Sequence, residues 1–327
     1  MQDLIDRIKA VAEPTRLRIV ELCAQGELAV SELTDILGQS QPRVSRHLKV
    51  LSDAGIIAPM REGNWTFYRL ERDPPDIAGP ILNLVNRDDP VFAEDRRRLK
   101  DVRHRRRTEA EAYFSNHAAG WDAIREMHVE SGPIERQLLA LVPKGAYGVH
   151  LDIGTGTGRI LTVLAKRVDR SIGVDNSRAM LAIARDRTAR AGLNSASLRL
   201  ADMYDLPLAD QSADLVTVHM VLHYADTPEQ VVAEAARVLR PGGRLIIVDF
   251  APHKNEDLRR IHAHRRLGFA DDEVRQWLDV SGLEWRRAEG LPGRALTVML
   301  WSADRSTDEA TEPLPWVAGS PAGSPWI

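Results

Sequence analysis

The fold of the larger part of the chain is decided by the stretch Leu151-Asp152-Ile153-Gly154-Thr155-Gly156-Thr157-Gly158. The residues from Gly148 to Ile153 are apolar enough for a buried parallel strand, and Arg159 to Arg167 resumes with the apolar spacing of a helix. Glycine is needed in the turn because a side chain would hold a ligand away from the backbone, and the helix start offers unpaired N–H groups. The stretch therefore predicts a strand, a tight turn and a helix around a nucleotide-type pocket.

Acidic side chains also end the next two predicted strands. The glycine spacing departs from the G-x-G-x-x-G pattern of dinucleotide sites, yet Asp175 follows the first glycine by about 20 residues, where a Rossmann-like fold holds ribose hydroxyls. Asp202 ends the third strand and could accept a hydrogen bond from an adenine amino group, while Met203 packs on the ring. A solvated carboxylate is the alternative for each acid, and it explains Asp202 alone about as well, but three acids at three strand ends favour one ligand.

This part of the chain, roughly Tyr113 to Ser302, resembles the class I S-adenosylmethionine-dependent methyltransferases. The fourth strand, 213–218, and the segment 237–249 with its Pro-Gly-Gly turn follow the family pattern. The segment 113–122, with its Tyr-Phe and Trp-Asp pairs, resembles the helix that covers the methionine end in ubiquinone and menaquinone methyltransferases. The resemblance implies a Rossmann-like α/β fold with a seven-stranded sheet.

The same resemblance assigns S-adenosylmethionine or S-adenosylhomocysteine as the cofactor. In the family, the glycine loop surrounds the methionine portion, the acid after strand two binds the ribose, and the acid after strand three lies by the adenine. The cofactor residues implied here are Asp152, Gly154, Gly156, Gly158, Asp175, Asp202 and Met203.

Residues 1 to about 72 predict a second, smaller domain. Apolar helices at 4–11 and 14–24 precede two short helices, of which the first, 31–38, is stopped by glycine. Ser40 is placed to cap the second short helix, with Pro42 in its first turn. Alternating residues on both sides of Gly63-Asn64 predict a hairpin, 56–70. This order is typical of a mostly α winged helix-turn-helix.

The second short helix, 41–51, carries a face suited to DNA. Val44, Leu48 and Leu51 recur at helical spacing and should face the core, so that polar and basic side chains point outward together. His47 is either a DNA contact or a packing residue, and we favour packing. The residues expected to contact DNA are Gln41, Arg43, Ser45, Arg46 and Lys49, with Arg61 on the hairpin.

The segments 13–19 and 41–51 resemble the ArsR/SmtB family of bacterial repressors. The resemblance implies a dimer that presents two helices to half-sites of an operator about one DNA turn apart. Members that sense metals carry thiolates in the helix matching 28–33, where this chain has none, and the last helix of the domain, 77–86, has no histidine. The one cysteine, Cys23, fits a small buried hydrophobe. We therefore expect no metal site.

Composition is consistent with two domains in the cytoplasm. The chain has 327 residues, a formal net charge of -3 and 43% hydrophobic residues. The sequence has no run of 18 apolar residues, so we expect no membrane span. It starts without secretory features and has a single cysteine, which fits a reducing cytoplasm. Weak acidity does not exclude DNA binding, because local charge decides it. We expect a DNA-binding domain over 1–87, a charged helical connector over 88–112, a methyltransferase domain over 113–302 and a disordered tail over 303–327.

Two functions fit these motifs. In the first, a dimeric repressor senses S-adenosylmethionine or S-adenosylhomocysteine and controls genes such as those of the methionine cycle, and we favour this one. In the second, the C-terminal domain methylates a small molecule, with His219 and His223 as the candidate bases nearest the expected substrate. Three other candidates for a base are Tyr224, His262 and His264. DNA methylation is not expected, because neither an Asn/Asp-Pro-Pro-Tyr/Phe run nor a Pro-Cys pair is present, and the single cysteine excludes arsenic methylation.

Overall fold

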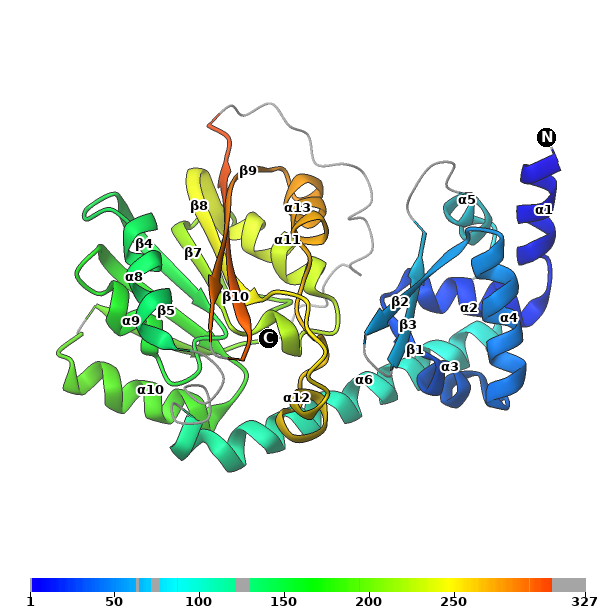
Figure 1. Cartoon of the computed structure of the whole chain (residues 1–327), viewed down its shortest axis with the longest axis horizontal. Coiled ribbons are helices and arrows are strands. Elements are labelled where there is room, and N and C mark those ends of the chain that lie inside the picture. The colour runs from blue at the N-terminus through cyan, green and yellow to red at the C-terminus, as the bar shows by residue number, and fades with distance from the viewer. Residues whose placement is uncertain are drawn as a thin grey trace, which may run out of the picture.

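A computed structural model describes residues 2–62, 65–71, 77–86, 88–121, 130–193, 195–293 and 295–307. Figure 1 shows two lobes joined along one edge by a long helix, α6 (Pro90–His117). In the described part of the chain, no helix has the length and apolar character needed to cross a membrane.

The smaller lobe is the predicted winged helix-turn-helix. Its recognition helix is α4, in which Val44, Leu48 and Leu51 are buried as the periodicity predicts. The preceding helix ends on Gly38 at a φ of 65°, a left-handed conformation that favours glycine. The lobe contains α1 (Gln2–Val11), α2 (Pro14–Ala24), β1 (Leu28–Ala29), α3 (Val30–Leu37), α4 (Gln41–Asp53), β2 (Ile57–Glu62), β3 (Trp65–Leu70) and α5 (Ala78–Asn83), with strands in the order β1-β3-β2.

The start of α4 differs from the expectation in one respect. Ser40 occupies the position before the helix, but its side chain makes no capping hydrogen bond. Pro42 sits in the first turn, where its missing N–H would have had no partner within the helix, so fewer donors there need a cap.

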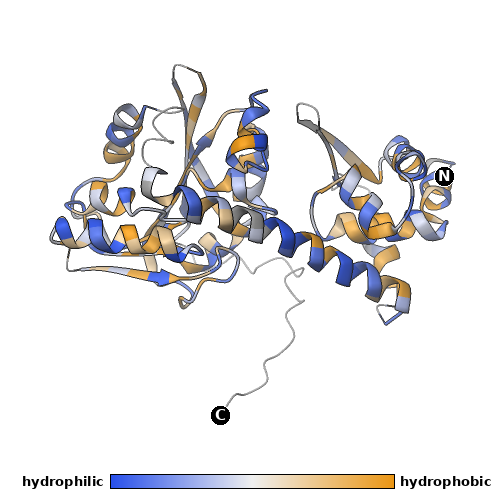
Figure 2. Cartoon of the chain, turned by 90° about the horizontal axis from the view of Figure 1, so that it is seen from below, coloured by the Kyte–Doolittle hydropathy of each residue, from blue (hydrophilic) through white to orange (hydrophobic). Residues whose placement is uncertain are grey.

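The connector α6 packs on both lobes. Asp89 accepts a hydrogen bond from the backbone N–H of Val91 and so caps its first turn. Arg18 of α2 then donates to both carboxylate oxygens of Asp95, each at 2.6 Å, which fastens the helix to the winged domain. The middle of α6 is hydrophilic, as Figure 2 shows, and the helix continues to His117, where it enters the larger lobe.

The larger lobe has the predicted Rossmann-like fold, with helices on both faces of one twisted sheet (Figure 1). The strand order is β6-β5-β4-β7-β8-β10-β9, and β10 alone runs antiparallel to its neighbours β8 and β9. The chain reverses direction across the sheet between β4 and β7, where folds of this kind bind ligands at the carboxyl ends of strands. The strands are β4 (Tyr147–Ile153), β5 (Val168–Asp175), β6 (Ala196–Leu200), β7 (Ala213–His219), β8 (Leu239–Phe250), β9 (Leu283–Pro292) and β10 (Thr297–Arg305).

The described helices of this lobe cover the sheet on its two sides. The helices are α8 (Ser131–Leu141), α9 (Arg159–Leu164), α10 (Arg178–Arg190), α11 (Pro228–Val238), α12 (Asp257–His262) and α13 (Asp271–Val280), with short 3-10 turns η1 (Ala118–Gly120) and η2 (Leu222–Tyr224). On α11, Val231, Val232 and Ala235 are fully buried against the strands.

Two sequence-based boundaries shift in the structure. The Pro241-Gly242-Gly243 segment is assigned to β8, because pairing with β7 already begins at Leu239. The last strand runs three residues into the region expected to be a disordered tail. Arg244 holds Asp304 through two hydrogen bonds of 2.7 and 2.9 Å, and Ala303 is fully buried, so these residues complete the sheet. The rest of the expected tail, 308–327, lies outside the described residues.

Candidate functional site: a cavity at the strand ends

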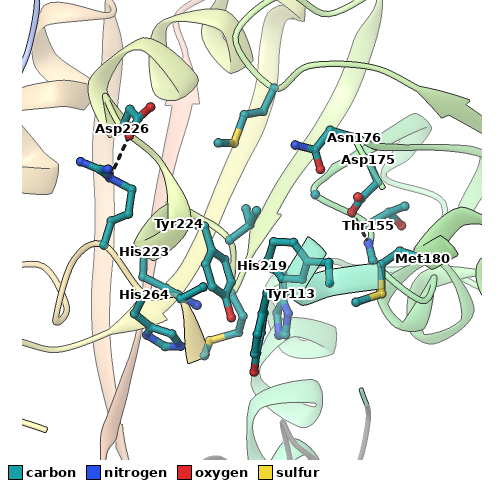
Figure 3. Close-up of a pocket in the computed structure, with 18 of the residues that line it drawn as sticks. Tyr113, Thr155, Asp175, Asn176, Met180, His219, His223, Tyr224, Asp226 and His264 are labelled. Carbon is teal, nitrogen blue, oxygen red and sulfur yellow. Dashed lines mark hydrogen bonds and ion pairs between the residues drawn. The ribbon is translucent and has the colours of Figure 1, made fainter. Parts of the chain in front are cut away.

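A cavity of about 380 Å³ opens at the carboxyl ends of β4, β5 and β7. Figure 3 shows Asp175, Asn176 and Met180 at one end and Asp226, His223 and His264 at the other. The sequence-predicted Asp152, Gly154, Gly156, Asp175, Asp202 and Met203 all line it, together with His219 and His223. Gly158 does not line it; at the start of α9, a Cβ on Gly158 would meet Ala184 of α10 at 3.0 Å, so this glycine serves helix packing.

The glycine loop leaves open space where the turn meets the cavity. Gly154 and Gly156 have φ values of 68° and 52°, in the left-handed region. A Cβ on Gly154 would meet Val221 at 2.5 Å, whereas a Cβ on Gly156 would meet no atom within 4 Å. Gly156 therefore leaves room for a ligand to approach the backbone.

Asp152 lines this end of the cavity and has one carboxylate oxygen without a hydrogen-bond partner among the described residues. Its Oδ1 accepts from Thr217 Oγ1 at 2.6 Å, and Thr217 in turn lies 2.8 Å from Nε2 of the buried His150. Its Oδ2 is buried without a hydrogen-bond partner among the described residues. Burial raises the pKa of the Asp152 carboxyl to about 6, although Thr217 donates to it. An ammonium or other donor on a ligand would satisfy the second oxygen.

Asp175 braces the loop from the end of β5. One carboxylate oxygen accepts from the backbone N–H of Gly156 and the other from that of Ser177, both at 2.8 Å. Burial raises the pKa of this carboxyl, while those backbone donors lower it. A carboxylate has about four acceptor sites, so Asp175 can still receive hydroxyl groups from a ligand.

Asp202 and Met203 close the same end after β6. Asp202 Oδ1 accepts from the backbone N–H of Tyr204 at 3.1 Å, in a tight turn that pairs Asp202 with Asp205. Met203 packs against the core of the sheet beside the cavity. Both residues line the cavity.

The other end of the cavity is lined mainly by rings. Tyr113 and Phe114 at the end of α6 stack edge-on against Trp121, with centroids 6.2 and 5.3 Å apart. Tyr113 also forms a hydrogen bond of 2.6 Å between its hydroxyl and Nδ1 of His262. Asp122, which belongs to the same predicted motif, lies outside the described residues.

His223 is held by an acid that the sequence did not single out. Its Nδ1 lies 2.8 Å from Oδ1 of Asp249, which is the next-to-last residue of β8 and is fully buried. The ring of His264 stacks on that of His223 with centroids 4.0 Å apart. Since Nδ1 is engaged, Nε2 is the nitrogen left to meet a ligand, as in acid–base pairs that position a histidine. Asp249 ends a strand like the other three acids, and that signal could have identified it.

The winged domain also contributes to the cavity, which no sequence pattern predicted. Ala29, Glu32 and Phe67 line it from β1, α3 and β3. Arg106 of α6 lines it as well, and its guanidinium pairs with Glu32 on one side and with Asp226, at 3.0 Å, on the other. Arg265 adds a second pair to Asp226 at 2.8 Å. These ion pairs fix the two domains against each other at the mouth of the cavity.

Of the side chains predicted to contact DNA, those that the structure describes do not line the cavity. Gln41, Arg43, Ser45, Arg46 and Lys49 are exposed on α4, where Lys49 pairs with Asp53 at 2.9 Å. His47 lies 3.5 Å from Glu13, and the side chain of Arg61 in β2 is outside the described part of the structure. Cys23 is buried, and burial raises its pKa to about 12. Among the described residues, no three His, Cys, Asp or Glu side chains gather closely enough to hold a metal ion.

Two family models match the chain. Residues 13–58 match the model described as bacterial regulatory protein, arsR family, and residues 151–247 match the model described as methyltransferase domain. The arsenic resistance transcriptional regulator ArsR1 of Pseudomonas putida is 39% identical over 99 residues, which are 30% of this chain and 77% of that regulator. The two matches fall on the two lobes.

The methyltransferase lobe has relatives of its own. The ubiquinone/menaquinone biosynthesis C-methyltransferase UbiE of Desulfotalea psychrophila is 34% identical over 155 residues, 44% of this chain and 62% of that enzyme. Five methyltransferases related by sequence are covered over only 36% to 62% of their own length. A solved chain from the complex of the Haloferax volcanii Trm112 methyltransferase activator with a methyltransferase shares the fold, with a TM-score of 0.51 and 24% identity over 59% of this chain and 97% of that one.

Replacing Gly156 by alanine tests whether its open space receives the cofactor. Gly192 is a matched control, because it also has a positive φ of 66° and no atom within 4 Å of an added Cβ, but it does not line the cavity. Both variants lose about 1–2 kcal/mol through backbone strain. We expect Gly156→Ala alone to weaken S-adenosylmethionine binding, by about tenfold or more, in isothermal titration calorimetry. Equal affinities for the two variants would show that the cofactor does not approach this loop.

Proposed function

We propose that this chain, which belongs to the arsR family of bacterial regulatory proteins, is a cytoplasmic, dimeric repressor. It carries a methyltransferase domain behind its DNA-binding domain, and its cavity binds S-adenosylmethionine or S-adenosylhomocysteine. The observation that carries the proposal is the shared cavity, in which Glu32 and Phe67 of the DNA-binding domain lie with the strand-end acids of the methyltransferase domain. A ligand there can favour one arrangement of the domains and so alter DNA affinity.

The residues at the inner end of the cavity suit this cofactor. Asp152 Oδ2 is the acceptor for the ammonium group of the methionine portion. Gly154 and Gly156 line the same end, where the open space at Gly156 gives that portion access to the backbone. Asp175 is the acceptor for the ribose hydroxyls, and Asp202 with Met203 flanks the adenine. S-Adenosylhomocysteine offers the same ammonium, ribose and adenine, so the pocket accepts both.

The outer surface of the winged domain suits a dimer on DNA. Leu4, Ile5 and Ile8 are exposed on one helix, α1, and Leu84 just after α5 is 86% exposed. Large apolar side chains exposed in this number favour a partner surface. A second copy seated there would present two α4 helices to the half-sites of an operator. Genes of the methionine cycle are the targets we propose for such a sensor.

A methyltransferase acting on a small molecule is the second candidate function, favoured by the His223–Asp249 pair. The cofactor, when bound, supplies an electrophilic methyl group. Nε2 of His223 would take the proton of an acceptor hydroxyl, while Asp249 holds the Nδ1–H and stabilises the resulting imidazolium. The test incubates the protein with labelled S-adenosylmethionine and the metabolites on which the products of neighbouring genes act. Transfer of the label to one of them by the wild type but not by His223→Asn would support this function. Cofactor binding without any transfer would count against it.

Operator binding in the presence of each ligand tests the regulatory function. An operator duplex selected from a random pool is titrated with the full chain alone, with S-adenosylmethionine and with S-adenosylhomocysteine in a gel-shift assay. We expect at least one ligand to change the dissociation constant by about 5- to 150-fold, the usual range of coupling between sites. Identical constants at saturating ligand would refute sensing.

Arg46→Ala separates DNA binding from cofactor binding. Arg46 is exposed on α4, so its removal should relax operator preference at the base it contacts by about 1–3 kcal/mol and leave the cofactor affinity unchanged. Arg97→Ala on α6 removes the same charge from an exposed site paired with Glu94 and should leave operator preference intact. The measurement compares the affinity of both variants for the selected operator and for a mismatched duplex. An equal loss of operator preference in the two variants would mean that positive charge alone, and not the position of Arg46 on α4, determines this preference.

Cofactor affinity should fall at acid pH because of Asp152. Its pKa of about 6 means that the carboxylate form is present at pH 8 and mostly lost at pH 5. An ammonium donor needs the ionised form, so the affinity for S-adenosylhomocysteine should weaken by about tenfold between pH 7.5 and pH 5. Asp152→Asn should bind weakly at both values, with a nearly flat profile. A wild-type profile as flat as that of the variant would remove Asp152 from the site.

A further inference from the structure

The two ends of the cavity differ in composition and in the domain that forms them. In Figure 3 the inner end is formed by Asp175, Asn176 and Met180, and the outer end by His223 and His264. Tyr113, Tyr224 and His219 lie between the two ends. The residues assigned to the cofactor all lie in the methyltransferase domain. The outer end has no part in those assignments, and it is the end that the winged domain closes.

Phe67 is the clearest contribution of the winged domain to the outer end. It lies in β3, a strand of the wing hairpin, pairs in register with Ala29 of β1 and is only 6% exposed. The guanidinium carbon of Arg259, which follows β8, lies 5.4 Å from the centroid of its ring. A molecule at the outer end therefore contacts the base of the wing as well as the methyltransferase domain.

The walls of the outer end define the chemistry of such a molecule. Flat rings pack well against aromatic walls, edge-on or offset. Nε2 of His223 is available to accept a proton or hydrogen bond, because Nδ1 is held by Asp249. The aromatic side chains that line the cavity are Phe67, Tyr113, Phe114, Trp121, Tyr224 and Phe250, of which Tyr113 and Tyr224 lie between its two ends in Figure 3.

We propose that the outer end is a second ligand subsite, distinct from the cofactor site, which takes a small aromatic molecule bearing a hydroxyl group and is walled by both domains. The inference rests on the proposed function, because it requires a chain that binds DNA and holds the cofactor at the inner end.

A continuous set of polar contacts leads from this subsite to the helix-turn-helix. The backbone carbonyl of His223 accepts from the N–H of Arg265 at 2.8 Å, and the side chain of Arg265 pairs with Asp226. Asp226 also pairs with Arg106, and Arg106 pairs with Glu32.

Glu32 is part of the helix-turn-helix itself. Its other carboxylate oxygen accepts from the backbone N–H of Ala29 at 2.8 Å and caps α3, which packs on α4. The aromatic ligand is thus an effector: by filling the space against Phe67 and His223 it selects one position of the wing and of α3 relative to the other domain.

Binding of 2-naphthol to the full chain saturated with S-adenosylhomocysteine tests the subsite, since no methyl group can then be transferred. We expect 2-naphthol to bind about tenfold more tightly than 2-methoxynaphthalene, which lacks the hydroxyl proton. Phe67→Leu, which keeps an apolar side chain but removes the ring, should weaken 2-naphthol about fivefold, as should Tyr113→Leu. Val280→Ala, exposed on α13, is the control and should bind like the wild type.

Gel shifts with the selected operator duplex then test the coupling. Saturating 2-naphthol should change the operator dissociation constant of the S-adenosylhomocysteine complex by about fivefold or more. Arg106→Gln should lose this change, measured at a 2-naphthol concentration that saturates the variant. Arg105→Gln, one residue away on the exposed side of α6 and 3.8 Å from Asp35, should behave like the wild type.

The results separate the inference from the function on which it rests. If the chain binds operator and S-adenosylhomocysteine, but 2-naphthol binds no better than its methyl ether or is unaffected by Phe67→Leu and Tyr113→Leu, the subsite is refuted. If 2-naphthol binds as expected but leaves operator affinity unchanged, its role as an effector is refuted. Failure to bind operator or S-adenosylhomocysteine at all would instead overturn the proposed function.

Discussion

Arg106 joins the two domains because its guanidinium pairs with Glu32 of the winged domain and with Asp226 of the methyltransferase domain. The three side chains are largely buried, so removing one partner would leave a charge without compensation, which is costly in a protein interior. The same contact holds Glu32 and Phe67 at the cavity. A displacement of the winged domain therefore changes the shape of the cavity, and a ligand in the cavity acts on the position of the winged domain.

The interface around Arg106 is polar. Arg266 is nearly buried and pairs with Glu27 of the winged domain at 2.8 Å and with Glu273 at 2.6 Å, while burial raises the pKa of Glu27 to about 7. The contact between the domains thus includes several ion pairs that are made together. This suits two alternative arrangements separated by a few kcal/mol, which is the range that a small ligand can shift.

Local patterns in the sequence predicted most of the fold and several residues that line the cavity. The acids Asp152, Asp175 and Asp202 end parallel strands, and such strand ends must gather at one edge of the sheet. The periodicity of Val44, Leu48 and Leu51 identified the buried side of α4. Asp249 follows the same strand-end rule and was within reach, whereas Gly158 shares the loop pattern but packs on Ala184.

Contacts between the domains could not be predicted in this way. Arg106 and Glu32 are 74 residues apart, and Arg106 and Asp226 are 120 apart, so no local spacing relates them. The affinities of S-adenosylmethionine and S-adenosylhomocysteine for the full chain, with and without saturating operator duplex, test their consequence most directly. Because linkage is reciprocal, operator should change the affinity of at least one of them by the same factor by which that ligand changes operator affinity, a factor of about five or more. If operator changes neither affinity, the coupling of cavity and DNA is contradicted.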